Sequence, residues 1–403
     1  MSIIIPANSA VGGGFEVANS CRFDDGSSDY LNRTPSSAGN RRTFTFSFWV
    51  KRATLGTSQF IYNVRPGASG ASQMLFASGD KLQFSFEPIS KSLETNRLFR
   101  DTSAWYHIVY AFDTTQGTAS NRIKLYVNGV QETSFGAANY PDQNADLDIN
   151  TTNVINIGRR LETSGSFIDM YLSEFVFIDG QALDPTSFGE FDEDSGIWKP
   201  ISVSGLTYGT NGFYLGADVS GESNNFTVNN LTSIDQTTDT CTNNFATLNP
   251  LASLPNTGVS TFTEGNTTSQ GVNGSYVNGG STLMMPSGKW YAEMKYVASS
   301  SASRCIVGIT QDVSEISRIN QDAGALNTFY VSGDGYKNIQ GSASSYGNTW
   351  TTGDIIGIAL DLDNNKLYFS KNESWQNGGD PTSGATGTGA ITGFDLPSAT
   401  ING

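Results

Sequence analysis

Segments in which apolar and polar side chains alternate recur along the whole chain. The clearest spans residues 44–50, where one side carries Phe44, Phe46, Phe48 and Val50 and the other carries Thr45, Ser47 and Trp49. Successive side chains of a strand point to opposite faces, so a period of two predicts a strand with one buried face. Such strands bury their apolar faces against a second layer, which restricts the chain to layered β architectures.

Further segments repeat this signal and are separated by turn residues. They span 82–86, 105–113, 122–131 and 171–183 in the first half, and 289–297, 305–310 and 354–372 in the second. Asn128-Gly129 predicts a type I′ hairpin turn because both residues tolerate a positive φ. Asp179-Gly180 and Asn364-Asn365 predict further turns, and Asp184-Pro185 predicts a single helical turn with Asp184 as its N-cap.

Composition supports the same fold class. Charged residues make up 15% of the 403 residues, below the usual ~25%, and Gly, Ser, Thr and Asn replace them. These residues favour turns over helices, and the 11% of aromatic residues supplies apolar faces that a disordered chain lacks. We therefore predict an all-β protein. Its 403 residues suggest two or three domains, at the usual ~100–200 residues per domain.

The charge balance excludes some partners. The chain has 23 basic and 38 acidic residues, for a formal net charge of −15, and no basic run longer than Arg41-Arg42 or Arg159-Arg160. We expect no nucleic acid as a partner, because phosphate binding requires Lys and Arg clusters. No run approaches the ~20 apolar residues of a membrane span, so we expect no membrane insertion.

The three cysteines, Cys21, Cys241 and Cys305, are widely spaced and odd in number. This pattern predicts neither a disulfide framework nor a zinc site. Free thiols are expected, as in a protein assembled in a reducing cytoplasm.

Four regions are expected from the changes in composition. Residues 1–20 form an N-terminal arm with Gly12-Gly13-Gly14, which either docks on a neighbouring subunit or frays. Residues 21–217 form a first sandwich, 218–255 an Asn/Thr-rich connector, and 256–403 a second sandwich.

The first half resembles laminin G-like, concanavalin A-type jelly rolls. The motifs that carry the resemblance are RFDDGSSDYLNRTP (22–35), FTFSFWVKR (44–52), WYHIVYAFD (105–113), RIKLYVNGVQ (122–131) and INIGRR followed by YLSEFVFIDGQAL (155–160 and 171–183). The resemblance implies a jelly-roll sandwich over about 190 residues.

The second half resembles SPRY-type sandwiches. Its motifs are GKWYAEMKY (288–296), IVGIT (306–310), GYKNIQGS (335–342) and the hairpin within 350–376. The family usually adds a strand after this hairpin, and none is evident before residue 403, so the expected domain is truncated at its C-terminus or belongs to a longer protein.

The pairing of these halves through the connector is similar to virion proteins of marine bacteriophages. The resemblance implies a tail fibre, spike or capsid-decorating protein, located in the virion and assembled in the host cytoplasm. It also implies other virion proteins as partners through the arm, and a homo-oligomer, by analogy a trimer.

Enzymatic chemistry finds little support in the sequence. Glycosidase jelly rolls of the laminarinase type carry both carboxylates in a Glu-x-Asp-x-x-Glu strand, and the nearest match, 190–195, ends in Ser195 instead. The single histidine, His107, lies inside a strand segment, where a structural role is expected and no second histidine supplies a base. We expect no catalytic residues and no enzyme activity.

Ligand residues can be considered by type, and none is assigned to a binding or metal site. We expect no cofactor; calcium is the alternative, because carboxylates in turn-like segments could supply some of its oxygen ligands: Asp24, Asp25, Asp142, Asp146 and Asp148. Sugar recognition would use side chains such as Tyr62, Arg65, Tyr140, Trp198, Tyr336, Tyr346 and Trp375, although packing in a core is expected for each.

These observations favour a phage structural or adhesion protein that binds a host-surface or environmental glycan or protein without catalysis. Two alternatives stay open: a secreted carbohydrate-binding module and a polysaccharide-degrading glycosidase.

Overall fold

The structure is a computed structural model that describes residues 14–67, 70–161, 166–216, 226–252, 261–270, 279–297, 305–310 and 327–394. Within these ranges the regular structure consists of strands and short 3₁₀ turns, with no α-helix. The predicted all-β fold is confirmed. No helical turn in the described part of the chain has the length and apolar character needed to cross a bilayer.

The chain divides into two compact units. The first contains the described residues up to Asn244 together with Thr263–Gly265, and the second contains the remaining described residues from Phe245 onward. The predicted arm, 1–20, lies outside the described residues as far as position 13. Its last part belongs to the first unit, where Val17 is buried.

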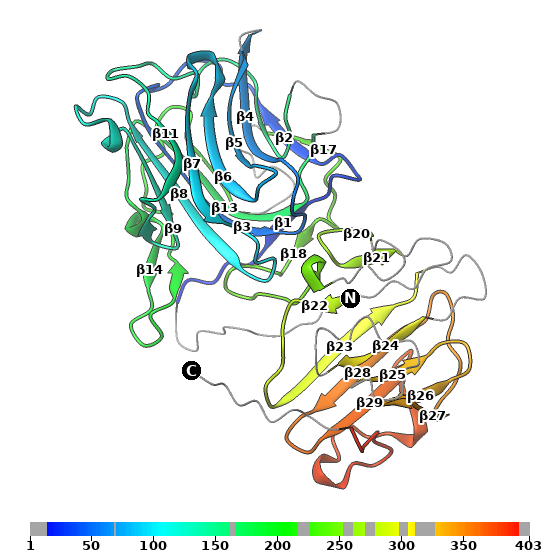
Figure 1. The fold of residues 1–403 in the computed structure, drawn as a ribbon. Coiled ribbons are helices and arrows are strands. Elements are labelled where there is room, and N and C mark those ends of the chain that lie inside the picture. The colour runs from blue at the N-terminus through cyan, green and yellow to red at the C-terminus, as the bar shows by residue number, and fades with distance from the viewer. Residues whose placement is uncertain are drawn as a thin grey trace. The chain divides into compact units, whose positions relative to one another are not determined.

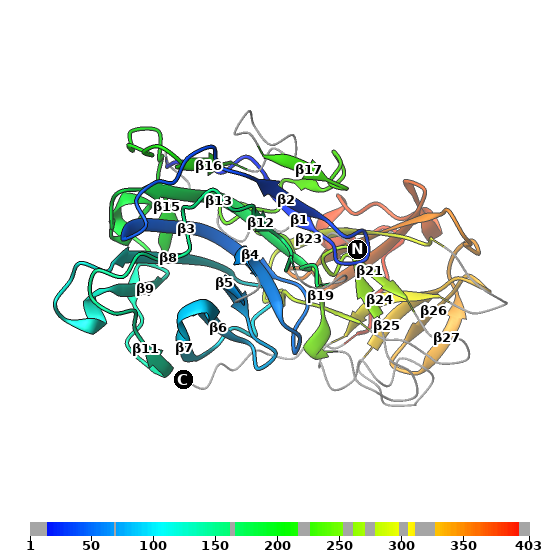
Figure 2. The ribbon, with the colours of Figure 1, turned by 90° about the horizontal axis from the view of Figure 1, so that it is seen from above.

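Two sheets form the first unit, and Figures 1 and 2 show them as layers. One sheet has the strand order β10 (Val130–Gln131), β9 (Ile123–Val127), β8 (Trp105–Asp113), β3 (Thr43–Arg52), β13 (Met170–Asp179), β1 (Ser20–Phe23) and β18 (Gln236–Thr237), with β16 (Phe213–Leu215) also paired to β13. The other has the order β11 (Phe135–Asn139), β7 (Lys91–Leu98), β6 (Lys81–Phe86), β5 (Gly70–Phe76), β4 (Gln59–Gly67), β12 (Ile155–Ile157), β2 (Tyr30–Arg33) and β17 (Thr227–Asn229).

The core of this unit lies between the sheets. Phe44, Phe46, Phe48 and Val50 of β3 point into it, as the alternation predicts, and all are fully buried. Phe84 of β6 and Phe112 of β8 meet there with ring centroids 5.1 Å apart. Aromatic rings from both layers thus fill the interior.

The outer face of β3 is also buried, which corrects the expectation of a single buried face. Thr45, Ser47 and Trp49 all lie below 5% exposure. The segment after β13 covers this side of the sheet, where Phe188 and Val203 pack on Val109, Val176 and Ile178. Alternation along β3 could not reveal this cover, because the covering residues lie far away in sequence.

The expected turns are present in the first unit. Asn128 and Gly129 have φ values of 49° and 78° between β9 and β10, which confirms the predicted hairpin. Asp184 caps the 3₁₀ turn Pro185–Ser187 by accepting a hydrogen bond from the backbone N–H of Thr186 at 2.9 Å. The other 3₁₀ turns within the described residues are Glu87–Ile89, Ala119–Asn121, Pro250–Ala252, Gln376–Gly378 and Gly384–Thr386.

Residues 226–244 lie in the segment expected to be a connector, and they belong to the first unit. β17 pairs with β2, and β18 pairs with β1. Phe226 and Leu231 join the core between the sheets. This stretch therefore adds one strand to the edge of each sheet.

The second unit has two four-stranded antiparallel sheets. One has the order β23 (Lys289–Lys295), β28 (Ile355–Asp361), β29 (Lys366–Lys371) and β30 (Ser374–Trp375), and the other β24 (Ile306–Thr310), β25 (Asn327–Val331), β26 (Tyr336–Ile339) and β27 (Ser342–Ser345). Val307 and Tyr330 of one sheet share an apolar cluster with Ile356, Ile358 and Phe369 of the other. The predicted hairpin over 354–372 is confirmed, and the SPRY resemblance of this unit stays a prediction.

Short strand pairs complete the described structure. They are β14 (Gly189–Phe191) with β15 (Trp198–Pro200), β19 (Leu248–Asn249) with β22 (Gly280–Ser281), and β20 (Thr261–Thr263) with β21 (Thr268–Gln270).

Candidate functional site

The outward face of the β23–β28–β29 sheet carries aromatic and charged side chains around a hollow. Alternation along β23 turns Ala292 and its even-numbered neighbours toward the core, so Lys289, Tyr291 and Glu293 face outward. The register places Tyr291 opposite Ala359 and Ala359 opposite Tyr368. The small Ala359 between the two tyrosines leaves a hollow on the sheet.

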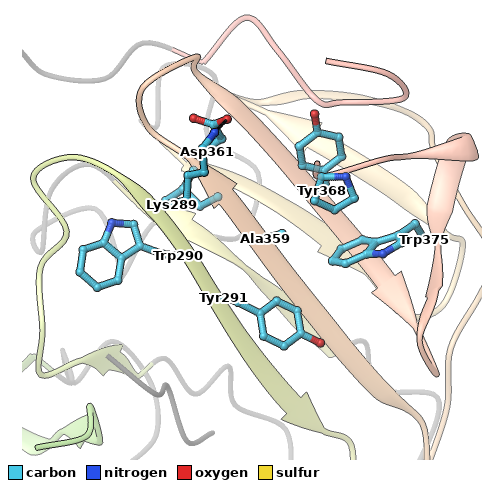
Figure 3. Close-up of a pocket in the computed structure, with 9 residues that line it drawn as sticks. Lys289, Trp290, Tyr291, Ala359, Asp361, Tyr368 and Trp375 are labelled. Atoms are coloured by element: carbon cyan, nitrogen blue, oxygen red, sulfur yellow. Dashed lines mark hydrogen bonds and ion pairs between the residues drawn. The ribbon is translucent and has the colours of Figure 1, made fainter. Parts of the chain in front are cut away.

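This hollow is an open groove of about 240 Å³ (Figure 3). Tyr291 is 45% exposed, and its ring lies 6.2 Å from that of Trp375 at an interplanar angle of 67°. Figure 3 shows the two rings next to each other, so that they meet edge to face. The lining residues are Lys289, Trp290, Tyr291, Ala359, Leu360, Asp361, Tyr368, Trp375 and Pro381.

Gly357 leaves room for the ring of Tyr291, because it has no side chain. A Cβ at this position would lie 2.7 Å from the tyrosine hydroxyl and would also collide with Ser370. The Tyr291 hydroxyl donates a hydrogen bond to Oε1 of Glu293 at 2.7 Å. Partial burial, together with this carboxylate, raises the pKa of Tyr291 to about 12, so the phenol stays neutral and keeps its hydrogen bond to Glu293.

A charged pair closes one end of the groove. Nζ of Lys289 donates to Oδ2 of Asp361, whose side chain is almost fully buried. The backbone N–H and the side-chain amide of Asn364 donate to the same carboxylate at 3.1 and 2.9 Å. Burial alone would raise the pKa of Asp361, but the hydrogen bonds from Lys289 and Asn364 outweigh it and lower that pKa.

The groove combines apolar rings with fixed polar groups. Aromatic faces can cover the C–H faces of a sugar ring, while the exposed ammonium of Lys289, held by Asp361, can donate to its hydroxyls. The volume is below the ~300–1,000 Å³ of typical small-molecule pockets. The site can therefore contact one ring of a longer ligand but cannot enclose a whole chain.

Among the aromatic residues considered for sugar binding, the structure places Trp375 in this groove. Tyr336 is 43% exposed on β26 in the other sheet of the unit. Tyr62, Trp198 and Tyr346 are buried, as expected of core residues, while Arg65 and Tyr140 are half-buried. Sequence reasoning missed Tyr291, although its outward position in the alternation of 289–297 was a usable signal.

His107 is part of a buried hydrogen-bonded network. Nε1–H of Trp198 donates to its Nδ1 at 2.9 Å, and its Nε2 lies 2.9 Å from the hydroxyl of Ser47. Because Nδ1 accepts, Nε2 carries the proton and donates to Ser47. Burial lowers the pKa of His107 to about 3, so the ring is neutral and held as a structural element.

The carboxylates of 190–195 lie on and just after β14. Lys199 of β15 pairs with Glu190 at 3.3 Å and with Asp192 at 3.2 Å. Hydrogen bonds from Ser195 and from Lys199 lower the pKa of Asp192 to about 2. Asp192 is therefore ionised at ordinary pH and unsuited to the role of proton donor.

The aspartates considered for calcium are dispersed. Asp142 pairs with Lys91, Asp146 with Arg42 and Asp148 with Arg41, whereas Asp24 is buried and Asp25 exposed. Among the described residues, no three His, Cys, Asp or Glu side chains form a group that could hold a metal ion. Cys21, Cys241 and Cys305 are all free thiols, as expected.

Another hollow, of about 650 Å³, lies in the first unit. Aromatic side chains of Phe15, Tyr208, Phe213 and Tyr214 line it, with hydroxyls from Ser202 and Ser204. It has no charged side chain in its lining, and its recognition chemistry is therefore less specific than that of the groove.

Residues 25–186 match the family model described as the concanavalin A-like lectin/glucanases superfamily. The first unit contains a laminin G-like, concanavalin A-like domain. The resemblance inferred from the first half of the sequence is thereby confirmed for this domain. A comparison with curated proteins gives no match.

Three solved structures similar to this chain share 12–15% identity with it. A Bacteroides ovatus protein whose name describes it as carbohydrate binding has a TM-score of 0.31, and the match covers 43% of this chain and 46% of that one. A heptameric SAP-like pentraxin from Limulus polyphemus has a TM-score of 0.33, with 55% and 98% covered. Domains LG4-5 of the mouse laminin alpha1 chain have a TM-score of 0.34, with 92% and 82% covered. The matched part thus spans about half the length of the Bacteroides protein.

Proposed function

We propose that the protein binds glycans without catalysis, through the groove on the second unit. The observation that carries the proposal is the exposed ring of Tyr291, which meets Trp375 edge to face in a groove that ends in the Lys289–Asp361 pair. A shallow platform of this kind suits a repeating polysaccharide, because each site needs to grip only one sugar ring. The lectin-type fold of the first unit supports a binding role for the chain as a whole.

The absence of catalysis is part of the proposal. A glycosidase needs two carboxylates across the sugar, one of them with a raised pKa to donate a proton. In the segment that best resembles such a strand, position 195 is Ser195, and Lys199 pairs with both Glu190 and Asp192. These pairs favour fixed, ionised carboxylates over an acid–base couple.

We further propose a phage virion as the setting, with the protein acting as a tail fibre, spike or capsid-decorating fibre. The pairing of two β units, and the resemblance of the sequence motifs to those of marine phage virion proteins, support this proposal. The partners would be other virion proteins, bound through residues 1–20, and a glycan or protein of the host surface. A trimer is the expected oligomer by analogy with fibres.

Glycan binding is tested by affinity electrophoresis of the full chain in gels that contain algal or bacterial polysaccharides. We expect retardation by at least one polysaccharide, and a loss of about 1–3 kcal/mol of binding free energy in Tyr291→Ala and Trp375→Ala, since each removes a stacking surface. Tyr336→Ala is the matched control, because it removes a similarly exposed tyrosine from the other sheet. Equal binding by all four proteins would rule the groove out.

Product release separates the alternatives. If the chain liberates reducing ends from a polysaccharide that it binds, the glycosidase alternative replaces the proposal. Mass spectrometry of purified phage particles tests the virion setting independently. Detection of the chain only as a free secreted protein would favour the carbohydrate-binding module.

A further inference from the structure

Lys51 is a fully buried lysine in the first unit. It lies in β3 between Trp105 of β8 and Tyr171 of β13, its partners in the strand register. Its side chain is 0% exposed, and Nζ lies 5.8 Å from the centre of the Tyr171 ring. Trp49, Trp105 and Tyr171 belong to one buried aromatic cluster. A lysine is almost never buried to this degree without a specific partner.

Two residues near the end of the first unit meet its amine. Oδ2 of Asp239 lies 2.8 Å from Nζ, and Oδ1 of Asn244 lies 2.9 Å from it. The Asp239 side chain is 3% exposed, and its other oxygen accepts a hydrogen bond from Nε1 of Trp105 at 3.1 Å. A nucleophile, a carboxylate and a carboxamide thus converge in a space enclosed by aromatic rings.

The orientation of the Asn244 amide is fixed by its surroundings. Nδ2 donates to the backbone carbonyl of Ser103 at 2.7 Å, which leaves Oδ1 facing Lys51. The carbonyl carbon Cγ is bonded to this oxygen, so the electrophilic carbon is held beside the amine. Alignment of this kind lowers the barrier to reaction between two bound groups.

The environment also activates the amine. Burial lowers the pKa of Lys51, although Asp239 partly opposes the effect. A desolvated lysine next to a carboxylate can give up a proton to it, and the neutral amine that remains is a nucleophile. Asp239 is in place to receive that proton and later to return it.

We propose that Lys51 and Asn244 become joined by an amide bond formed autocatalytically, with Asp239 as the proton carrier. Asp239 takes a proton from the Lys51 ammonium, and the lone pair of Nζ attacks Cγ of Asn244. The Cγ–Nδ2 bond then breaks, while protons from Nζ and Asp239 pass to the leaving nitrogen. The products are a Lys51–Asn244 amide and one ammonium ion, with the Asp239 carboxylate regenerated and no oxidant, reductant or cofactor consumed.

The bond would fasten the end of the first unit to a central strand of its sheet. Lys51 and Asn244 lie 193 positions apart in the sequence, so the link closes most of the first unit into a covalent ring. This inference is independent of glycan binding, because neither residue contributes to the groove of the second unit.

The test is the intact mass of the purified full chain, compared with that of Asn244→Ala. Asn244→Ala keeps the Lys51–Asp239 pair, so it is expected to fold. After correction for the substitution, wild type should be lighter by one molecule of ammonia, and its digest should contain a branched peptide that joins Lys51 to Asn244. Asn243→Ala is the matched control, because it alters the adjacent asparagine and should keep the deficit.

Three results would overturn the proposal. One is a wild-type mass equal to that expected from the sequence. Another is an ammonia deficit that persists in Asn244→Ala, which would place the loss at another asparagine, for example as a succinimide. A deficit of one water in place of ammonia would identify Asp239 as the acceptor and would also refute the assigned bond.

Discussion

The indole Nε1–H of Trp198 donates a hydrogen bond of 2.9 Å to Nδ1 of His107. Trp198 comes from the β14–β15 hairpin and His107 from β8, so this bond fixes the hairpin to the face of the sheet. Ser47 of β3 completes the network at Nε2. The only imidazole of the chain is thereby held neutral in the interior.

Acid should destabilise the first unit through His107. The unfolded chain takes up a proton at the ordinary histidine pKa of 6.5, whereas the folded ring does so only near pH 3. The contribution of neutral His107 to the free energy of unfolding is therefore fully present above pH 6.5 and is lost as the pH falls toward 3. At pH 5 the loss in the free energy of unfolding is about 2 kcal/mol.

Urea denaturation at pH 7 and pH 5 measures this loss. His107→Gln is the control, because glutamine can form hydrogen bonds but does not titrate in this range. A difference between wild type and His107→Gln that is independent of pH would contradict the prediction.

Gly129→Ala should loosen the β14–β15 hairpin. Gly129 has a φ of +78°, and a Cβ at this position would overlap the ring of Trp198. We expect a loss of about 1–3 kcal/mol in the free energy of unfolding, measured in urea. Gly180→Ala separates the two causes, because Gly180 has a φ of +94° but nothing within 4 Å of an added Cβ. Similar losses in both variants would show that the contact with Trp198 contributes nothing.

Asp80→Ala should be strongly destabilising. Asp80 accepts hydrogen bonds from Arg52 at 3.1 Å, Arg100 at 2.9 Å and the N–H of Gly56 at 2.8 Å. The Arg52 side chain is fully buried, so removal of Asp80 leaves an uncompensated charge, at a cost of about 3–5 kcal/mol.

The comparison for Asp80 is Asp146→Ala, measured by thermal unfolding under the same conditions. Asp146 pairs with Arg42 at an exposed site, where little change is expected. If the two substitutions shift the melting temperature equally, burial of the Arg52–Asp80 pair is not what makes it important.

Asp169→Asn should stabilise the first unit at high pH. Burial raises the pKa of Asp169 to about 7, although a hydrogen bond from Thr54 opposes the effect. Between pH 3.8 and 7 the unfolded chain is ionised at this position while the folded chain stays protonated. A rise in pH therefore favours unfolding. The free-energy cost of ionising the buried Asp169 in the folded chain is fully present above pH 7.

The carboxamide that this substitution introduces would mimic the protonated carboxyl of Asp169. The variant should therefore match wild type near pH 4 and exceed its stability by about 1–3 kcal/mol at pH 8. Denaturant midpoints at the two pH values provide the test. A variant that is less stable than wild type at pH 8 would show that the carboxylate is stabilised by the fold.

Much of the strand structure could be predicted from local patterns. The alternation at 44–50, 105–113 and 354–372 marks strands, and Asn128-Gly129 marks a hairpin, because these features depend on residues that are adjacent in sequence. The inner face of β3 follows in the same way. Burial of its outer face does not, because Phe188 and Val203 come from a distant segment.

The candidate site was predicted only in part. Trp375 was considered by residue type, but its partner Tyr291 comes from a strand far earlier in the sequence. Their proximity depends on the register of β23, β28 and β29, which no local pattern specifies. The Lys51–Asp239–Asn244 cluster was missed for the same reason. The SPRY resemblance, the virion setting and the absence of catalysis stay predictions.

The strands β17 and β18 determine where a fragment that contains a stable first unit has to end. Each covers an edge, of β2 and β1 respectively, whose backbone groups would otherwise be open to pairing with another molecule. A fragment that ends at residue 217 would leave both edge strands unpaired, and we expect it to aggregate through these edges. In a fragment that ends at Asn244, β17 and β18 remain paired with both edges.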